Sequence, residues 1–286
     1  MEQGGWLQRR PWQAMLLPYA AMMLLFIVLP LANLAIVSFH ENSATGIWGE
    51  ALTLKNYDAL IDPFYLYLIA RTLRIGAIST ISCILLGYPM AYFLARATRQ
   101  VTAVCLFLLV MPLMVSTVIR AFGWMVILGR NGLVNEVGEW LGVGRLVNIM
   151  PSETAVIIGL VQIVLPLMVL PLMAAIEKIP RTVEEAAANL GCWPALTFMR
   201  IIVPLSAPGL VSGALLCFTV SISVVVTPAL LGGRRARMFG NEIYDQVIAS
   251  LNWPMAASLS IVLILLTFGL TMIGILAGRK RRAKEV

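Results

Sequence analysis

Few residues of this chain are suited to covalent chemistry. His40 is the only histidine among the 286 residues, which argues against a histidine metal cluster and against a serine–histidine–aspartate triad. The sequence contains no Gly-x-x-x-x-Gly-Lys-Ser/Thr phosphate loop. The cysteines are scattered without any Cys-x-x-Cys pair, so they indicate neither a zinc site nor a disulfide framework. These cysteines are Cys83, Cys105, Cys192 and Cys217. The sequence therefore predicts no catalytic residues, no metal ligands and no cofactor.

One charged residue lies deep within an apolar stretch. Arg120 follows an uncharged run at residues 101–119, and an arginine within a membrane span is a candidate functional residue because its burial is costly. Trp124 lies four positions further on, so a helix would place both side chains on one face. We expect the pair to line a translocation pathway, or Arg120 to serve as a clamp onto helix carbonyls between spans or subunits.

A second stretch with charged residues lies between strongly apolar runs. It is residues 179–204, IPRTVEEAAANLGCWPALTFMRIIVP. Thr182 and Glu185 have the spacing of a capping box, which predicts a helix that begins at Val183. The apolar residues of this helix would share one face, with Glu184 and Glu185 off it. These apolar residues are Val183, Ala186, Ala187 and Leu190.

The same stretch contains residues that end one helix and start another. Gly191 is suited to the left-handed C′ position that ends the first helix. Pro194 fits the first turn of a second helix, which we expect to continue until Pro204 interrupts it. A third segment would open near Ser206 and Pro208. The pattern predicts two short helices at nearly a right angle, either as a solvated connector or as a rigid docking element.

The composition is that of an integral membrane protein. Hydrophobic residues make up 60% and charged residues 12% of the chain, against about 45–50% and about 25% in soluble domains. The formal net charge of +7 does not require nucleic acid, because membrane proteins leave lysine and arginine on their cytoplasmic side. We therefore expect membrane lipid, and no nucleic acid, around this chain.

Six apolar runs are long enough to cross a hydrocarbon core of about 30 Å as helices. They lie at about residues 16–39, 68–95, 102–128, 155–175, 208–231 and 255–277. The runs are too long and continuous for barrel strands, which predicts an all-α polytopic protein with one transmembrane domain over residues 1–286. The first run is longer than the apolar core of a signal peptide, so we interpret it as an uncleaved anchor.

The basic residues predict the orientation. With a cytoplasmic N-terminus, Arg9, Arg10, Arg96, Arg99 and the basic cluster at residues 279–284 all lie inside. The cluster after the fifth run is an exception, since it would lie outside; its members are Arg234, Arg235 and Arg237. We expect both termini and the loop at about residues 177–206 to be cytoplasmic.

The spacing in this loop resembles a known signature. Glu185-Ala186-Ala187, then three residues and Gly191, then nine residues and Ile201-x-Val203-Pro204, is similar to the EAA motif of membrane subunits of binding-protein-dependent ABC importers. Val203 replaces the leucine that is usual before the proline. In that family the motif forms a coupling helix that docks in a cleft of the ATPase subunit. The resemblance implies that residues 177–206 form a cytoplasmic coupling loop. Its implied ATPase-coupling residues are Glu184, Glu185, Ala186, Ala187, Gly191, Ile201 and Pro204.

The resemblance covers most of the chain and points to the polyamine branch of the family. Four stretches look like the first of the two permeases in spermidine/putrescine importers. They are TLRIGAISTISCILLGYPMAYFLA from Thr72, MPLMVSTVIRAFGWMVILGRNGLVN from Met111, VTPALLGG from Val226 and NWPMAASLS from Asn252. This likeness implies a type I importer core in a bacterial inner membrane, with the pathway between this chain and a second homologous permease. It also implies two ABC ATPase subunits, which would bind the ATP, and a periplasmic solute-binding protein.

The sequence also bears on the solute and on two other classes of membrane protein. The resemblance implies a polyamine such as spermidine or putrescine, or alternatively an anionic or zwitterionic solute such as an opine, an aminoalkylphosphonate or an iron chelate. A secondary transporter would show acidic residues within the spans and often an internal repeat, and neither is visible. An intramembrane enzyme would need a catalytic constellation, which is also not visible. The sequence therefore favours a permease.

Overall fold

The computed structural model describes residues 11–43, 48–49, 51–142 and 150–282. Arg9, Arg10 and Lys284, which contribute to the predicted orientation, lie outside these ranges. The described chain is helical, and its β structure is one isolated bridge between His40 and Leu52. The predicted all-α class is confirmed. The long helices are α1 (Pro11–Ser38), α3 (Pro63–Arg96), α7 (Glu153–Glu177), α11 (Ala207–Ser223) and α13 (Trp253–Arg282). The shorter α-helices are α2 (Lys55–Ala59), α4 (Arg99–Val110), α5 (Thr117–Leu128), α6 (Leu133–Trp140), α8 (Arg181–Asn189), α9 (Pro194–Thr197), α10 (Val203–Leu205) and α12 (Phe239–Ile248).

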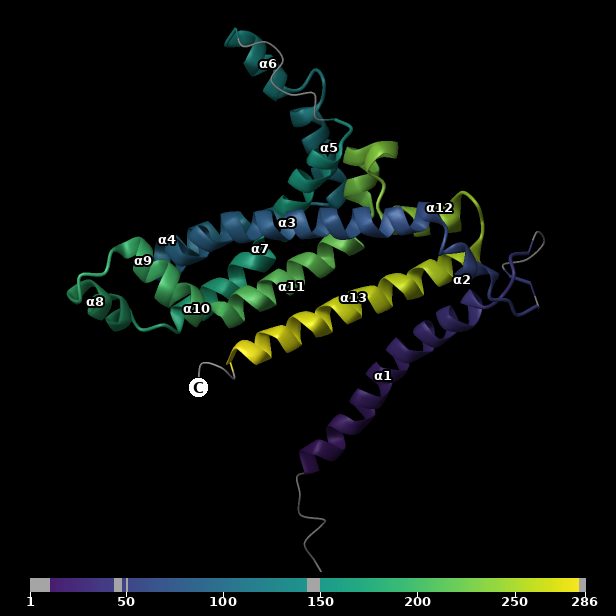
Figure 1. Cartoon of the computed structure of the whole chain (residues 1–286), viewed down its shortest axis with the longest axis horizontal. Helices are drawn as coiled ribbons and strands as arrows, with labels where there is room; N and C mark the ends of the chain where they lie inside the picture. Colours follow the sequence, from purple (N-terminus) through teal and green to yellow (C-terminus); the bar gives the residue numbers. More distant parts are fainter. Residues whose placement is uncertain (1–10, 44–47, 50, 143–149, 283–286) are drawn as a thin grey trace, which may run out of the picture.

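Helices α3, α7 and α11 form the centre of the bundle, α13 lies alongside, and α1 packs against α13 (Figure 1). The three central helices approach closely because glycines face Met168 of α7. A Cβ atom on Gly87 of α3 would lie 3.0 Å from Met168 Cγ, and one on Gly213 of α11 would lie 2.9 Å from Met168 Sδ. Met168 is fully buried in this contact. Small residues at such positions allow helices to pack tightly where lipid supplies no hydrophobic driving force.

Polar caps set the starts of the central helices. Asp62 precedes α3 and accepts a hydrogen bond from the Phe64 amide at 2.8 Å, with Pro63 in the first turn. Ser152 precedes α7 and accepts from the Ala155 amide at 3.3 Å. Such caps satisfy amides that have no partner within the helix. Both helices therefore begin before the apolar runs at 68–95 and 155–175.

The third predicted run is not one straight helix. Residues Arg99–Met114 and Thr117–Trp140 form a pair bent by 100°. Pro112 lies in a 3₁₀ turn, η1 (Met111–Met114), after which Val115 is extended with φ −86° and ψ 137°. Because proline has no N–H to donate, the α-helix tightens and then breaks there. The span predicted at about 102–128 is therefore a bent pair of helices, which can count as one span.

The fifth run also ends earlier than predicted. Helix α11 stops at Ser223, and the following residue Val224 is extended. Pro228 has no N–H for the Val224 carbonyl, and it opens a π-helical turn, η3 (Pro228–Gly232), instead. Within the span predicted at about 208–231, the α-helix thus ends at Ser223 and a π-helical turn follows. In the described residues, four helices are long and apolar enough to cross a membrane, or up to six if each bent pair forms one span.

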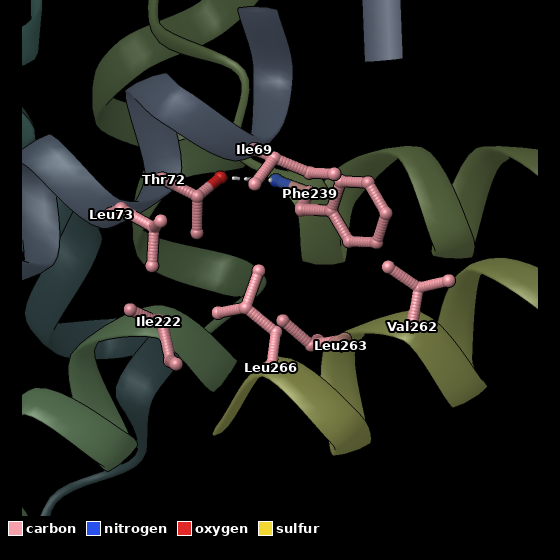
Figure 2. A pocket seen from close by; sticks show the side chains of 8 residues that line it. All are labelled: Ile69, Thr72, Leu73, Ile222, Phe239, Val262, Leu263 and Leu266. Atoms are coloured by element: carbon pink, nitrogen blue, oxygen red, sulfur yellow. Dashed lines mark hydrogen bonds between the residues drawn. The ribbon is translucent and has the colours of Figure 1, made fainter. Parts of the chain in front are cut away.

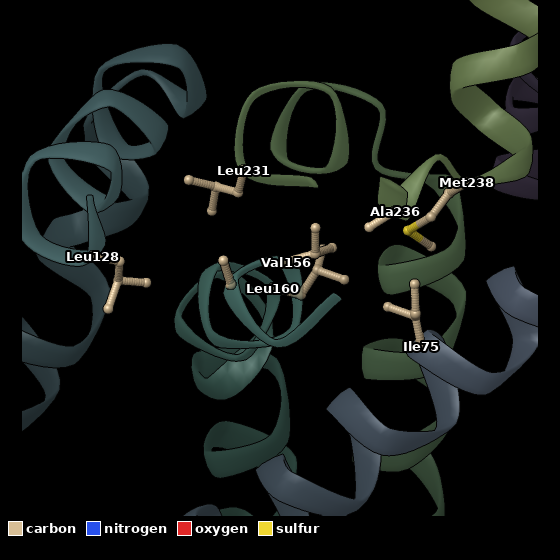
Figure 3. Packing of buried hydrophobic residues seen from close by; sticks show 8 residues of the cluster. Ile75, Leu128, Val156, Leu160, Leu231, Ala236 and Met238 are labelled. Carbon is tan, nitrogen blue, oxygen red and sulfur yellow. The ribbon is translucent and has the colours of Figure 1, made fainter. Parts of the chain in front are cut away.

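The end of the bundle opposite α8 is closed by apolar packing. Leu128 of α5, Leu160 of α7 and Leu231 of η3 meet in one buried cluster, together with Ile75 of α3 (Figure 3). Nearby, the Thr72 hydroxyl of α3 accepts the Phe239 amide at 2.8 Å, which holds the start of α12 (Figure 2). The apolar cavity beside this bond measures about 10 Å³, too small for a solute. We interpret it as a packing gap.

Candidate functional site

The predicted coupling loop, residues 177–206, contains α8, α9, α10 and a π-helical turn, η2 (Phe198–Ile202). Helix α8 begins at Arg181, two residues before the predicted start, and it has no side-chain cap. Pro180 is extended with φ −60° and ψ 140°, and its carbonyl accepts the Val183 amide at 3.2 Å. Thr182 is therefore already inside the helix. The predicted capping box between Thr182 and Glu185 is wrong, because Pro180 is the N-cap residue and no side chain caps the helix.

The residues of the predicted apolar face are divided between the bundle and the surface. Ala187 is buried and Val183 and Glu184 are half-buried, whereas Ala186 and Leu190 are exposed, Leu190 at 88%. Glu184 faces inward because the end of α3 supplies partners for its carboxylate. Glu185 faces outward, as expected of a residue that could meet a partner protein.

Glu184 is bound on both carboxylate oxygens. The Tyr92 hydroxyl donates to Oε2 at 2.7 Å, and the Arg96 Nε donates to Oε1 at 2.9 Å. A second guanidinium nitrogen of Arg96 forms an ion pair with Oε1. Sequence reasoning did not identify Tyr92 or Arg96 as partners of this loop. A usable signal was their spacing of four residues, which places a hydroxyl and a guanidinium on one face of the last turn.

Gly191 ends α8 in the conformation that the sequence predicts. Its φ is +77°, in the left-handed region. The Gly191 amide donates to the Ala188 carbonyl and the Cys192 amide to the Ala187 carbonyl, each at 2.9 Å. This pair of bonds is the Schellman arrangement, which satisfies carbonyls at a helix end. The chain direction after α8 is therefore fixed by backbone geometry.

The second part of the loop is anchored by an aromatic side chain. The Phe198 ring lies edge-on between Tyr88 and Tyr92 of α3, with centroid distances of 5.0 and 5.5 Å. Pro204 does not interrupt the helix as predicted, since helical structure continues to Leu205. Because Pro204 cannot donate to the Arg200 carbonyl, the preceding turn widens into η2 instead.

The loop then turns into the membrane. Ser206 is buried and donates to the Ile202 carbonyl at 2.7 Å, and its hydroxyl also contacts the Tyr88 hydroxyl. The helical part Pro194–Leu205 meets α11 at a bend of 72°. Of the remaining motif residues, Ile201 is half-buried and Pro204 is exposed. The loop is therefore fixed to α3 at Glu184, Phe198 and Ser206.

Three large apolar side chains of the loop are strongly exposed. Leu190, Trp193 and Met199 are 88%, 76% and 68% exposed. Exposed apolar side chains of this size are candidates for contact with a partner protein. The sequence analysis did not predict Trp193 or Met199 as site residues. The signal that could have identified them is that both are large apolar residues in a loop with polar neighbours.

Arg120 and Trp124 lie on α5, beyond the bend of the third run, and each has a different environment. The Trp124 Nε1 donates to the Gln162 Oε1 of α7 at 2.6 Å, which ties α5 to the central helices. The Arg120 Nη2 donates to the Thr117 hydroxyl at 3.2 Å. Within the described residues, the Nε and Nη1 atoms of Arg120 are buried without a hydrogen-bond partner. Leaving buried donors unsatisfied is costly, so these atoms favour an acceptor beyond the described residues.

The described residues offer no cluster of three or more histidine, cysteine, aspartate or glutamate side chains that could hold a metal ion. The two buried cysteines of the central helices contact backbone instead. Cys83 Sγ lies 3.7 Å from the Val161 carbonyl oxygen, and Cys217 Sγ lies 3.2 Å from the Val164 carbonyl oxygen. Their positions are those of packing residues in the bundle.

The bundle and its anchored loop define a class of membrane permease. The fold is similar to that of a chain in a bacterial alginate ABC transporter in complex with alginate pentasaccharide-bound periplasmic protein, with a TM-score of 0.75 over 92% of this chain and 91% of that one. The two sequences are 17% identical, so the likeness concerns the fold, that of type I ABC importer permeases.

The family follows from the sequence matches. Residues 83–282 match the family described as binding-protein-dependent transport system inner membrane component, and this chain belongs to that family. The spermidine/putrescine transport system permease protein PotB of Salmonella typhimurium (strain SL1344) is 39% identical, over 84% of both chains. PotB of Escherichia coli (strain K12) is 38% identical, over 87% of this chain and 91% of its own length. The chain is thus a multi-pass permease of the inner membrane.

Proposed function

We propose that this chain forms half of the translocation pathway of an ATP-driven importer, together with a second homologous permease. Two ABC ATPase subunits would supply the energy, and a periplasmic solute-binding protein would deliver the solute. The observation that carries this proposal is the coupling loop. It is held to α3 by hydrogen bonds and ring contacts, and it exposes large apolar side chains.

The geometry of the loop suits docking to an ATPase. Phe198 and Glu184 fix the loop to α3, so a force applied to its surface moves it as a unit. Leu190 and Trp193 supply the exposed apolar area that a partner cleft can bury. The exposed Glu185 could meet basic side chains at the rim of that cleft. The central part of the contact would be hydrophobic and its border charged.

The proposed solute is a polyamine such as spermidine or putrescine. Support comes from the relatives named as spermidine/putrescine permeases, at 39% and 38% identity over most of their lengths. Arg120 is the observation that favours a second candidate. Its unpaired buried nitrogens could receive a carboxylate or phosphonate, which would indicate an anionic or zwitterionic solute such as an opine, an aminoalkylphosphonate or an iron chelate. We favour the polyamine, with Arg120 serving as a clamp between subunits.

The orientation gives a direct test, because the coupling loop can meet an ATPase only from the cytoplasm. In a cysteine-free background, a single cysteine at the exposed Glu139 is expected to react with an impermeant maleimide added to intact cells. A cysteine at Glu185 or at Arg99, both also exposed, is expected to react only after the cells are opened. Labelling of the Glu185 site from outside would invert the topology and exclude the docking role.

Arg120 separates the two classes of solute. A polycation near an unpaired guanidinium is repelled by on the order of 4 kcal/mol at about 4 Å and an effective dielectric near 20, so for a polyamine Arg120 must be neutralised by a clamp contact. We expect Arg120→Gln to lower the yield of complex, while the assembled complex takes up spermidine within about twofold of the parent rate. The measurement is uptake in proteoliposomes, normalised to assembled complex.

Two outcomes would contradict the clamp. One is loss of uptake in fully assembled Arg120→Gln complex with recovery by Arg120→Lys, since only the charge would then matter to the solute. The other is transport of an anionic solute in preference to spermidine by the parent complex. Gln162→Leu serves as a matched control, because it removes the hydrogen bond to Trp124 without touching the guanidinium.

A further inference from the structure

The contact between Glu184 and α3 has the geometry of a latch. Both carboxylate oxygens accept side-chain hydrogen bonds, from Tyr92 at 2.7 Å and from Arg96 at 2.9 Å. The side chains of Arg96 and Glu184 are only 16% and 23% exposed. Ion pairs on the open surface contribute little, but a half-buried pair with several hydrogen bonds is held in one geometry. This latch (Tyr92, Arg96 and Glu184) therefore fixes α8 relative to α3.

Two further hydrogen bonds extend the connection to the backbone. Arg96 Nη2 donates to the Ile179 carbonyl at 3.1 Å, at the linker that leads into α8. Arg181 Nη2, in the first turn of α8, donates back to the Arg96 carbonyl at 2.8 Å. Arg96 is thus the one residue of the latch that holds both the linker and the helix. Its position at the last residue of α3 places all of these bonds at one helix end.

Apolar packing holds α8 only weakly. Among the residues of α8, Ala187 is buried and Val183 is half-buried, and the helix lies beyond the end of the bundle (Figure 1). Helix α3, by contrast, packs along both α7 and α11 (Figure 1). The latch therefore adds a polar link between a lightly packed helix at the surface and the central helix α3, beside the packing of Val183 against the cluster that includes Tyr88 and Leu94.

We propose that Arg96 is a positioning residue that passes movement of α8 to α3, so that Glu184 serves as an internal link and not as a contact to the ATPase. This inference rests on the proposed function, because an ATPase would supply the movement. The proposal gives the two adjacent glutamates different roles. Glu185 contacts the ATPase, and Glu184 transmits the movement of α8 to α3.

The test uses the complete importer in proteoliposomes and measures three quantities: the amount of bound ATPase, the rate of ATP hydrolysis and the solute taken up per ATP hydrolysed. With Arg96→Gln we expect ATPase binding and hydrolysis within about threefold of the parent, because the docking surface is untouched. Uptake per ATP is expected to fall about tenfold, as loss of charge-assisted hydrogen bonds releases the link. Arg99→Gln, a change at an exposed arginine three residues away, is the matched control and is expected to change nothing.

A charge-reversed double variant distinguishes a role in transmitting movement from a role in stabilising the fold. The double variant Arg96→Glu with Glu184→Arg restores an ion pair with reversed polarity, and we expect it to regain about a third or more of the parent uptake per ATP. Unchanged uptake per ATP in Arg96→Gln would overturn the proposal. Joint loss of ATPase binding and uptake would also overturn it, because the latch would then serve assembly. Failure of the parent chain to bind an ATPase would instead contradict the proposed function.

Discussion

Gly191→Val is expected to remove transport and to prevent co-purification of the ATPase, while the chain still inserts in the membrane. The φ of +77° at this position is unfavourable for any residue with a Cβ atom and most of all for a β-branched one. A Cβ at this position would meet no other atom within 4 Å, so the effect comes from the backbone alone. A valine that leaves the left-handed region breaks the bonds to Ala187 and Ala188 and turns Trp193 away from its present direction.

The size of this effect can be compared with a matched substitution. Asparagine tolerates the left-handed region, so Gly191→Asn is expected to keep uptake within about threefold of the parent, whereas Gly191→Val is expected to lose more than about tenfold. Uptake and bound ATPase are measured on equal amounts of membrane-inserted chain. Equal activity of the valine and asparagine variants would show that the direction of the chain after α8 does not matter for coupling.

Trp193→Ala is expected to weaken ATPase binding by about 30-fold or more. Tryptophans at the centre of protein interfaces often contribute about 2–4 kcal/mol, and about 1.4 kcal/mol corresponds to a factor of ten. Trp193 is 76% exposed in this chain and lies between the end of α8 and the start of α9, so a docked partner would cover it. The measurement is a titration of purified ATPase against the assembled permease pair.

Trp140 provides the control for this prediction. It is 85% exposed at the end of α6, away from the coupling loop (Figure 1). Trp140→Ala removes the same side chain from a surface that the ATPase is not expected to reach, and binding should stay within about twofold. Equal affinities of the two alanine variants would contradict the assignment of the apolar surface as the docking site.

The sequence was a good guide to which segments are helical and a poorer guide to where helices break. Proline illustrates the difference. Pro166 and Pro171 lie inside the continuous helix α7, which is packed between α3 and α11. Pro112 and Pro228 instead lie where the third and fifth runs break. Each proline removes one backbone donor, and the surrounding helices decide whether the helix continues. That packing is not contained in the local sequence.

The coupling loop also shows which features of a site can be predicted from local sequence and which cannot. The left-handed Gly191 could be predicted because local backbone chemistry dictates it. The inward direction of Glu184 could not, because its partner Arg96 is 88 positions earlier in the chain. The capping box failed for a local reason, because Pro180 starts α8 before Thr182 can cap it. Local rules thus predicted the turn at Gly191 but not the start of α8, and the long-range ion pair had to be observed.

The proposed function requires that transport by this chain is driven by ATP through partner subunits. The most direct measurement is uptake of labelled spermidine into proteoliposomes that contain the permease pair and the solute-binding protein, with and without the ATPase subunits and ATP. We expect uptake only when ATPase and ATP are both present, with no response to an imposed proton or sodium gradient. Uptake by the permeases alone, driven by such a gradient, would contradict it and would identify a secondary transporter.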